Sequence, residues 1–155
     1  MFIIETSTGT KHEVEIKHVE SSDFKNIGKK RYYFDWNVER HYELFKLSLV
    51  KSNDILGLLS IEKFHDEWRI HIRLLTVSKE NKGTEKAYDR IAGNLIMFAS
   101  RLAVQDFAEL ACVSLRPKSD IAQHYIEKYK MKSTGLTLSI EAPEIFHLIN
   151  EYNHD

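Results

Sequence analysis

Hydrophobic and polar residues alternate through much of the first half of the chain, a pattern that is typical of half-buried β-strands. Two short runs of this kind, at residues 1–6 and 13–18, are separated by a polar turn. Three longer runs follow at residues 41–51, 55–64 and 68–77, with short polar breaks between them. Because such breaks suit hairpins, we expect these three strands to form an antiparallel meander.

The last of these runs contains an irregularity. Its apolar residues first recur at every second position, at Trp68, Ile70, Ile72 and Leu74. Leu75 then breaks this period, and Val77 shares the parity of Leu75. A change of face within a strand is typical of a β-bulge, which bends the strand and often lies beside a functional site. The alternative is a strand whose end is buried on both faces.

Helical patterns begin after this strand. Apolar residues recur at three- and four-residue spacings, which predicts an amphipathic helix of about 20 residues against a sheet. Thr84 stands where an N-cap is expected, and Glu85 follows in the first turn, where the helix dipole favours an acid. A short strand at residues 110–115 comes next, and Ser119 is positioned to cap a second helix over residues 120–129. A strand at residues 136–141 and a helix opened by Pro143 complete the pattern.

The order of these elements is strands first, followed by strand–helix–strand–helix–strand. It predicts an α+β fold built on a mixed, mostly antiparallel sheet flanked by helices. The strands at residues 68–77 and 110–115 are joined through a helix, so we expect them to run parallel. With 155 residues, the chain has the size of one domain, and we expect a single domain over residues 1–155.

Composition and charge narrow the function classes. The 22 Lys and Arg residues balance 23 Asp and Glu residues without a basic or acidic half, so no nucleic-acid partner is expected. Apolar stretches run to five residues, far below a membrane span, and the start of the chain lacks a basic signal-peptide region. The single cysteine, Cys112, is expected to be a buried thiol in a reducing, cytoplasmic compartment. The eight histidines form no H-x-x-x-H pair, so no metal site is expected.

The strand end, the following loop and the second helix carry a set of motifs. The motif residues of the strand end and the loop are Leu75, Thr76, Val77, Lys82, Gly83, Thr84, Glu85, Lys86 and Ala87. Residues 125–131, which read Tyr-Ile-Glu-Lys-Tyr-Lys-Met, close the second helix. Over residues 70–131 these motifs resemble the core of the GNAT acetyltransferase superfamily, whose members transfer acyl groups from acyl-CoA to amines.

This resemblance implies a three-layer α/β/α arrangement with a bulged central strand and a cofactor-binding core over about residues 67–131. Acetyl-CoA would be the co-substrate, without a metal ion. Its pantetheine would pair with the backbone at Leu75, Thr76 and Val77, and its pyrophosphate would rest on amides of the loop before a helix start. Ser119 belongs to the same cofactor-binding set. The acceptor amine would attack directly, so no covalent enzyme intermediate is expected.

The loop departs from the family pattern at two positions. Lys82 replaces the usual Arg or Gln, and Glu85 stands where the family has its first critical glycine. Glu85 therefore places a side chain and a negative charge close to the diphosphate. Ala87 is an accepted variant of the second glycine.

The helix tail also differs from the family pattern. When the tail is aligned on its last two residues, Ile126 occupies the position of the family's tyrosine, which protonates the departing thiolate. A local shift of the helix would let Tyr125 or Tyr129 act as this general acid. The alternative is that both tyrosines pack in the core with their hydroxyl groups hydrogen-bonded.

A candidate general base lies on the irregular strand. Some members of the family carry a glutamate six residues before the closing valine, and in this chain that position is His71. An imidazole titrates near neutral pH and can take a proton from an ammonium nucleophile. The neighbouring Arg73 would lower the pKa of His71, which suits a neutral base. The alternative is a solvated or hydrogen-bonded strand histidine.

The sequence thus predicts an acyl-CoA-dependent N-acyltransferase acting on a small-molecule or peptide amine, with no nucleic-acid or membrane partner. The alternative, favoured by Glu85 and the displaced tyrosine, is a GNAT-fold module that binds CoA or regulates, with little or no transfer. An exposed edge of the meander also offers a pairing surface for a homodimer.

Overall fold

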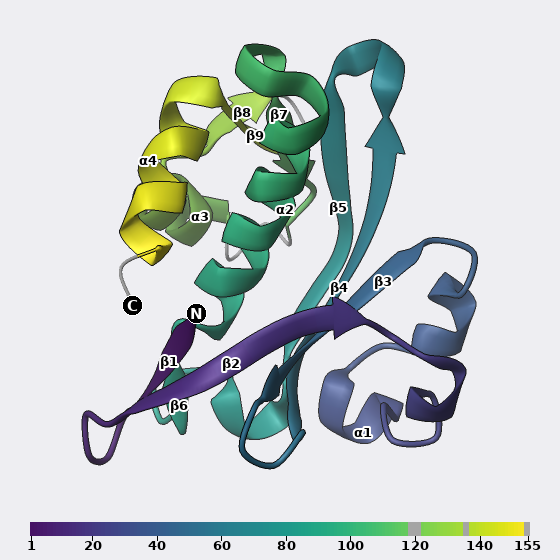
Figure 1. Ribbon diagram of the computed structural model, residues 1–155, viewed down its shortest axis with the longest axis vertical. Helices are drawn as coiled ribbons and strands as arrows, with labels where there is room; N and C mark the ends of the chain where they lie inside the picture. The colour runs from purple at the N-terminus through teal and green to yellow at the C-terminus, as the bar shows by residue number, and fades with distance from the viewer. Residues whose placement is uncertain (118–121, 135–136, 154–155) are drawn as a thin grey trace. The chain divides into compact units, whose positions relative to one another are not determined.

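The computed structural model describes residues 1–117, 122–134 and 137–153 (Figure 1). The chain divides into two units. The first comprises Met1–Ser60 and Leu74–Leu95, and the second comprises Ile61–Arg73 and the described residues from Ile96 onward. Strands β4 (Ile55–Phe64) and β5 (Arg69–Val77) and helix α2 (Ile91–Phe107) each contribute residues to both units.

In the first unit the strands follow the order β6–β1–β2–β3–β4–β5. The pairs from β6 to β3 are antiparallel. Their bounds are Phe2–Glu5 for β1, Lys11–His18 for β2, Glu43–Leu49 for β3 and Tyr88–Asp89 for β6. The strands predicted at residues 1–6, 13–18 and 41–51 are therefore confirmed, and β3, β4 and β5 are neighbours, as a meander requires.

A segment of short helices connects β2 to β3 and covers an apolar cluster. It contains the 3-10 helices η1 (Ser21–Asp23) and η2 (Trp36–Glu39) and the helix α1 (Lys29–Tyr32). The Tyr32 hydroxyl donates to the carbonyl oxygen of Ile55 at 2.7 Å, which ties α1 to the start of β4. The buried members of the cluster are Ile27, Tyr32, Trp36, Leu44, Ile55 and Leu58.

In the second unit β5 runs parallel to β7 (Cys112–Leu115), in a register that pairs His71 with Ser114. This pairing confirms the predicted parallel strands. β7 is antiparallel to β9 (Thr137–Glu141), which in turn is antiparallel to β8 (Lys132–Thr134). Cys112, predicted to be a buried thiol, is half-buried, and burial raises the pKa of the thiol.

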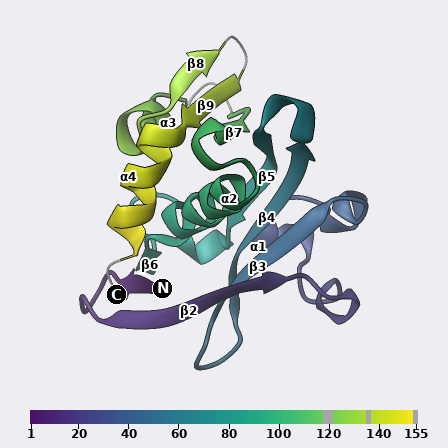
Figure 2. The same cartoon turned by 45° about the horizontal axis from the view of Figure 1, so that its top comes forward.

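Helices α3 (Ala122–Tyr129) and α4 (Ala142–Tyr152) contact β9 in the same unit (Figure 2). Proline stands in the first turn of α4, as predicted for Pro143, because its missing N–H would have no helical partner there. The predicted cap of α3, Ser119, lies outside the described residues. No helix in the described ranges is long and apolar enough to span a membrane. The sequence therefore folds as predicted, with a mixed, mostly antiparallel sheet and flanking helices.

The start of α2 differs from the prediction. Thr84 and Glu85 lie in a turn, and the helix begins only at Ile91, so Thr84 is not its N-cap. The intervening residues Tyr88 and Asp89 are extended, because they pair with β1 as strand β6. A local pattern could not show this, since β1 is formed by the opposite end of the sequence.

The end of β5 is covered on both sides. Ile70, Ile72 and Thr76 are buried, whereas Leu75 and Val77 are half-buried. This pattern agrees with the alternative reading of a strand end in contact with other residues on both faces. The bulge stays a prediction.

Gly57 in β4 occupies a position with no room for a side chain. A Cβ atom there would lie 2.8 Å from Ile91 Cγ2 and 3.0 Å from Leu95 Cδ1, both on α2. We expect Gly57→Ala to lower the free energy of unfolding by about 1 kcal/mol, because helix side chains must shift. Urea denaturation measures this change. In the control Gly28→Ala the added Cβ meets nothing within 4 Å, so a loss of similar size there would contradict the packing explanation.

Candidate active site

The end of β5 leads directly into the loop that was predicted to hold a pyrophosphate. The Ser78 amide donates to the carbonyl oxygen of Leu56 at 2.8 Å, which fixes the end of β5 beside β4. The loop continues through the 3-10 helix η4 (Lys79–Asn81) to Gly83, whose φ of +87° lies in the left-handed region. A glycine at this position relieves the backbone strain that any other residue would add.

Hydrogen bonds close the base of this loop. The Ala87 amide donates to the carbonyl oxygen of Glu80 at 3.1 Å, and the Tyr88 amide donates to Asn81 Oδ1 at 2.8 Å. Thr6, next to β1, donates its amide to the carbonyl oxygen of Ala87 at 2.9 Å and its hydroxyl to that of Lys86 at 2.6 Å. Residues 82–86 therefore form a closed projection with a fixed base.

Residues 82–86 differ from the predicted anion site in which backbone amides are open and in where the following helix begins. The Ala87 amide is used inside the loop, and the loop does not run into the N-terminus of α2, which begins at Ile91. Within the described chain, the amides of Gly83, Thr84 and Glu85 donate no hydrogen bond. These three amides can bind an oxyanion, although without a helix dipole behind them.

The two lysines within residues 82–86 already have partners. Lys82 Nζ lies 4.5 Å from the centroid of the Tyr33 ring, and Lys86 Nζ lies 2.9 Å from Asp89 Oδ1. Glu85 is exposed. The positive charge near the three open amides is therefore partly neutralised within the loop itself.

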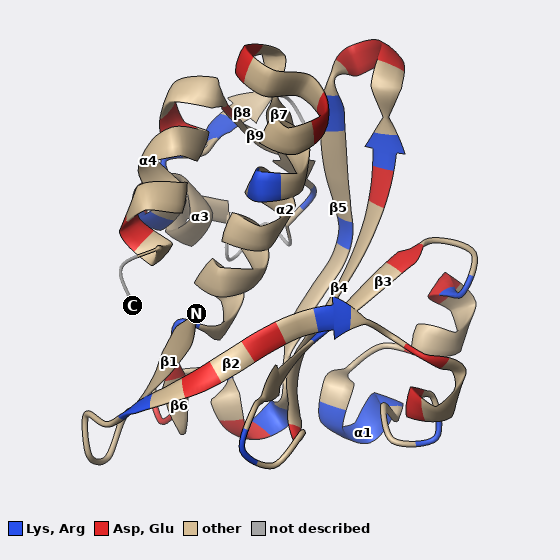
Figure 3. Ribbon diagram, viewed as in Figure 1, with Lys and Arg blue, Asp and Glu red and all other residues tan. Residues whose placement is uncertain are grey.

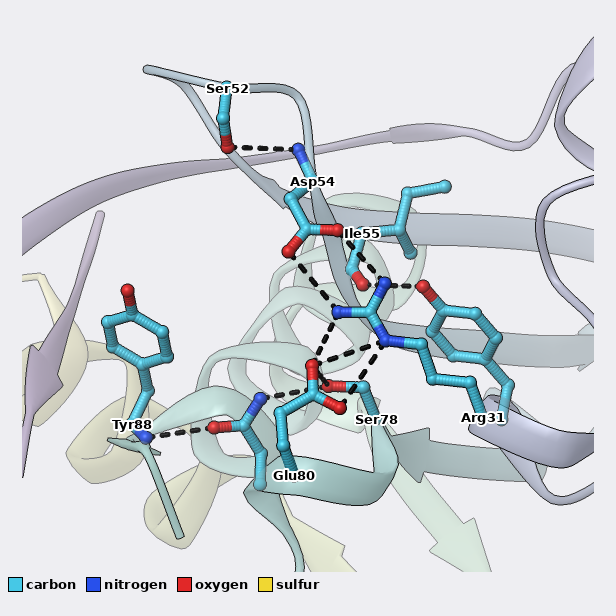
Figure 4. Close-up of polar contacts among 9 residues, drawn as sticks. Arg31, Ser52, Asp54, Ile55, Ser78, Glu80 and Tyr88 are labelled. Atoms are coloured by element: carbon cyan, nitrogen blue, oxygen red, sulfur yellow. Dashed lines mark hydrogen bonds and ion pairs between the residues drawn. The ribbon is translucent and has the colours of Figure 1, made fainter.

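Arg31 on α1 binds the carboxylate of Glu80, which belongs to this loop (Figure 4). Its guanidinium donates to both carboxylate oxygens of Asp54, to Oδ1 at 3.0 Å and to Oδ2 at 3.2 Å. Its Nε donates to Glu80 Oε1 at 3.2 Å, and its Nη2 also donates to the Glu80 carboxylate. These bonds hold the pKa of the Glu80 carboxyl below its ordinary value and raise the pKa of Arg31. Both groups are therefore charged at neutral pH.

The same carboxylate connects Arg31 to the base of the loop. The Ser78 hydroxyl donates to Glu80 Oε1 at 3.0 Å and accepts from Asn81 Nδ2 at 2.8 Å. Ser78 is fully buried and Asn81 is 4% exposed, so this part of the network is shielded from water. Sequence reasoning missed Arg31, because it stands in a run of basic residues and its partners are far away in the sequence.

In the second unit His71 lies on β5 beside a small polar group. Its Nδ1 lies 2.8 Å from Ser114 Oγ on β7, and Arg69 Nη1 donates to the same oxygen at 2.8 Å. Burial lowers the pKa of His71, and the charges of Arg69 and Arg73 lower it further. The imidazole is therefore neutral at physiological pH, as a general base must be.

Two tautomers of His71 fit the contact with Ser114. A serine oxygen can accept two hydrogen bonds, so it can accept from both Arg69 and His71 Nδ1. Nε2 then carries the lone pair and can take a proton. In the other tautomer the hydroxyl donates to Nδ1, and the proton sits on Nε2.

The two candidate acids lie on α3, with ring centroids 5.7 Å apart. Burial raises the pKa of Tyr125, so its phenol keeps its proton at neutral pH and can donate it. Tyr129 is 3% exposed, and Lys128 Nζ lies 5.6 Å from its ring centroid. Tyr129 is therefore a core residue, whereas Tyr125 is half-buried.

The predicted site residues fall into the two units. Leu75, Thr76 and Val77, together with residues 82–87, belong to the first unit. His71, Tyr125 and Tyr129 belong to the second. Ser119 lies outside the described residues.

No protein-family model matches the sequence, and no curated protein matches it. Solved structures match the fold. One is a protein of Bacillus anthracis assigned as a streptothricin acetyltransferase, in complex with acetyl coenzyme A: TM-score 0.63, 13% identity, covering 84% of this chain and 99% of that one. Another is a spermidine/spermine N-acetyltransferase of Vibrio cholerae: TM-score 0.64, 13% identity, covering 86% and 96%.

A third is the ribosomal-protein-S18-alanine N-acetyltransferase of Escherichia coli, with a TM-score of 0.61, 10% identity and coverage of 83% of this chain and 94% of that one. The names of these proteins refer to streptothricin, to spermidine and spermine, and to an alanine of ribosomal protein S18. At such low identity the likeness shows the fold, which is the GNAT fold predicted from the sequence, and leaves the acceptor undetermined.

Proposed function

We propose that this chain, a single domain with the GNAT fold, is an acyl-CoA-dependent N-acyltransferase of the cytoplasm. It moves an acetyl group from acetyl-CoA to an amine of a small molecule or a peptide, without a metal ion. The fold is the observation that carries this proposal, because the chain matches N-acetyltransferases over 83–86% of its length.

In the proposed reaction the amine nitrogen bonds to the carbonyl carbon of the thioester, and the carbon–sulfur bond breaks. His71 takes the proton that the nitrogen loses and passes it to water. Tyr125, or Tyr129 in its place, donates a proton to the departing sulfur and regains one from water. The neutral imidazole and the protonated phenol have the charge states that these two steps require.

The first unit would hold the acyl donor. The backbone of Leu75, Thr76 and Val77 would pair with the pantetheine, and the open amides of Gly83, Thr84 and Glu85 would contact the pyrophosphate. Lys82, Lys86 and Ala87 complete the loop, and Ser119 stays a proposed contact. The left-handed Gly83 supports this assignment, because a side chain there would strain the turn that presents the amides.

A second candidate is a GNAT-fold module that binds CoA, or regulates, with little or no transfer. The structure of the loop favours it: the Ala87 amide is already bonded, the helix starts late, and Glu85 adds a negative charge. These features weaken anion binding without affecting His71. The two candidates therefore differ in turnover more than in fold.

A thermal-shift titration with acetyl-CoA tests both candidates. At a concentration of 100 times Kd, binding should add about 2.7 kcal/mol to the free energy of unfolding. Release of free CoA thiol is then followed with polyamines, amino acids, aminoglycosides and peptides as acceptors. Binding with turnover supports the transferase, and binding without turnover for any amine supports the module. No shift at millimolar acetyl-CoA contradicts both.

A further inference from the structure

The first unit contains a polar cavity that the proposed acyl transfer does not use. Its volume is about 530 Å³, within the range of small-molecule sites. Glu15 and Lys17 of β2 lie opposite Ser48 and Lys46 of β3, so these four side chains share one face of the sheet and form the floor. Three charged residues of the neighbouring segments also line the cavity: Asp23, Arg31 and Asp54.

Each cation of the cavity is paired with a carboxylate. In Figure 3 the ribbon of β2 carries both red and blue segments, and α1 is blue. The pairs are Lys17 Nζ–Glu15 Oε1 at 2.9 Å, Lys46 Nζ–Asp23 Oδ2 at 2.7 Å and Arg31 Nη1–Asp54 Oδ1 at 3.0 Å. The three positive and three negative groups cancel. A ligand that carries only one sign of charge would therefore meet a repelling charge of the same sign beside every attracting charge of the opposite sign.

The pair formed by Lys46 and Asp23 differs from the other two in its burial. Its side chains are only 16% and 14% exposed, whereas those of Arg31 and Asp54 are 37% and 45% exposed. Removing two charges from water costs free energy that their mutual attraction often fails to return, so a buried pair contributes little to stability. The stability of the fold therefore does not by itself account for this pair.

This pair also has unused hydrogen-bonding capacity. Asp23 Oδ2 accepts from Lys46 and from the Glu20 amide, but within the described chain no group donates to Asp23 Oδ1. The Lys46 ammonium has three N–H groups and uses one of them on Asp23. Beside it, Ser48 is 3% exposed. The floor thus offers donors from Lys46 and Ser48 next to an acceptor from Asp23.

We propose that this cavity binds a small zwitterion of the α-amino acid class. The carboxylate of the ligand accepts from Lys46 and Ser48, and its ammonium group donates to Asp23 Oδ1 and to Glu15. A ligand whose positive and negative groups have the spacing found in an amino acid satisfies the donors and the acceptor. Neither of its charges then faces a group of the same sign. The site does not depend on acetyl-CoA or on the proposed transfer.

Amide NMR titration of the whole chain, without acetyl-CoA, tests this proposal. The probes are the twenty protein amino acids, first mixed and then singly, each with its carboxamide and its N-acetyl form as analogues that lack one charge. We expect saturable shifts of the Lys46 and Ser48 amide signals by one or more amino acids. Both analogues should bind at least about tenfold more weakly, which corresponds to 1.4 kcal/mol.

Variants of the floor provide the second half of the test. The double variant Asp23→Asn/Lys46→Met leaves no uncompensated buried charge and should stay folded, as its melting curve will show. It should bind the amino acid at least about tenfold more weakly. Lys51→Met, an exposed lysine outside the cavity, should bind like the wild type. The proposal is overturned by the absence of saturable shifts at 10 mM amino acid, a concentration about ten times the upper end of the usual range of KM values. Equal binding of the analogues, or unchanged affinity in the folded double variant, would overturn it as well.

Discussion

Replacement of His71 by asparagine is expected to lower turnover at pH 7.5 by about 10²–10⁴-fold, the usual contribution of a general base. Asparagine can still bond to Ser114 from the position of Nδ1, so β5 and β7 should keep their pairing. It cannot accept a proton at neutral pH. The affinity for acetyl-CoA should not change, because binding of the donor is assigned to the other unit. Steady-state kinetics with the best acceptor amine measures both quantities.

The pH profile identifies the base more directly than the rate does. The pKa of His71 is lowered from 6.5, by burial first and by Arg69 and Arg73 next. A neutral base loses activity when it is protonated, so the limb of the kcat/KM profile that reports His71 should lie below pH 6.5 in the wild type. The asparagine side chain does not titrate, and this acidic limb should disappear in His71→Asn.

Two further variants separate catalysis from packing. His65→Asn removes an exposed imidazole from the same unit and should leave turnover unchanged. Ser114→Ala removes the partner of Nδ1, so it should shift the acidic limb and lower turnover less than His71→Asn does. If His71→Asn retained turnover within about twofold of the wild type, with the acidic limb intact, His71 would be a structural residue and not the base.

The elements that the sequence predicts well are those whose pattern is local. β4 matches the predicted run at residues 55–64, and the parallel pairing of β5 with β7 follows from the helix between them. The first result rests on a periodicity within one run of residues, and the second rests on the order of consecutive elements along the chain. The fold could therefore be predicted from the sequence.

The missed features depend on contacts between distant parts of the chain. Tyr88 and Asp89 continue an amphipathic pattern and would suit a helix, but they pair with β1 and therefore form a strand. The projection at residues 82–86 is closed by Thr6, which no loop motif could indicate. The same holds for the candidate site: Gly83 was identified by its residue type, whereas Arg31 owes its role to Asp54 and Glu80.

Arg31→Met is expected to affect both the stability of the chain and the proposed donor site. The substitution leaves Asp54 and Glu80 without their shared cation, and each had accepted charge-assisted bonds from it. We expect the free energy of unfolding to fall by about 2 kcal/mol at pH 7, a network value reduced for the solvent exposure of these side chains. Acetyl-CoA binding should weaken roughly tenfold, because Glu80 also holds the base of the loop through Ser78.

The pH dependence of this loss distinguishes the ion pair from simple packing. The pKa of Glu80 is held below its ordinary value of 4.5 by Arg31, so the charged folded form is favoured. A group with a lowered pKa contributes stability above its unfolded pKa, and this contribution is lost as the pH falls through the folded value. The stability difference between the wild type and Arg31→Met should therefore be full at pH 7 and shrink steadily below pH 4.5.

Two controls make this result specific to the guanidinium. Lys29→Met removes an exposed cation from the same helix and should change neither stability nor acetyl-CoA affinity. Arg31→Lys keeps the charge but cannot form the fork that reaches two carboxylates, so it should fall between the wild type and Arg31→Met. Denaturation curves at pH 7, 5 and 3.5 compare the three variants. A loss that stays constant across this range would mean that Arg31 acts through the packing of its stem against Tyr32, whose ring centroid lies 5.3 Å from the guanidinium carbon.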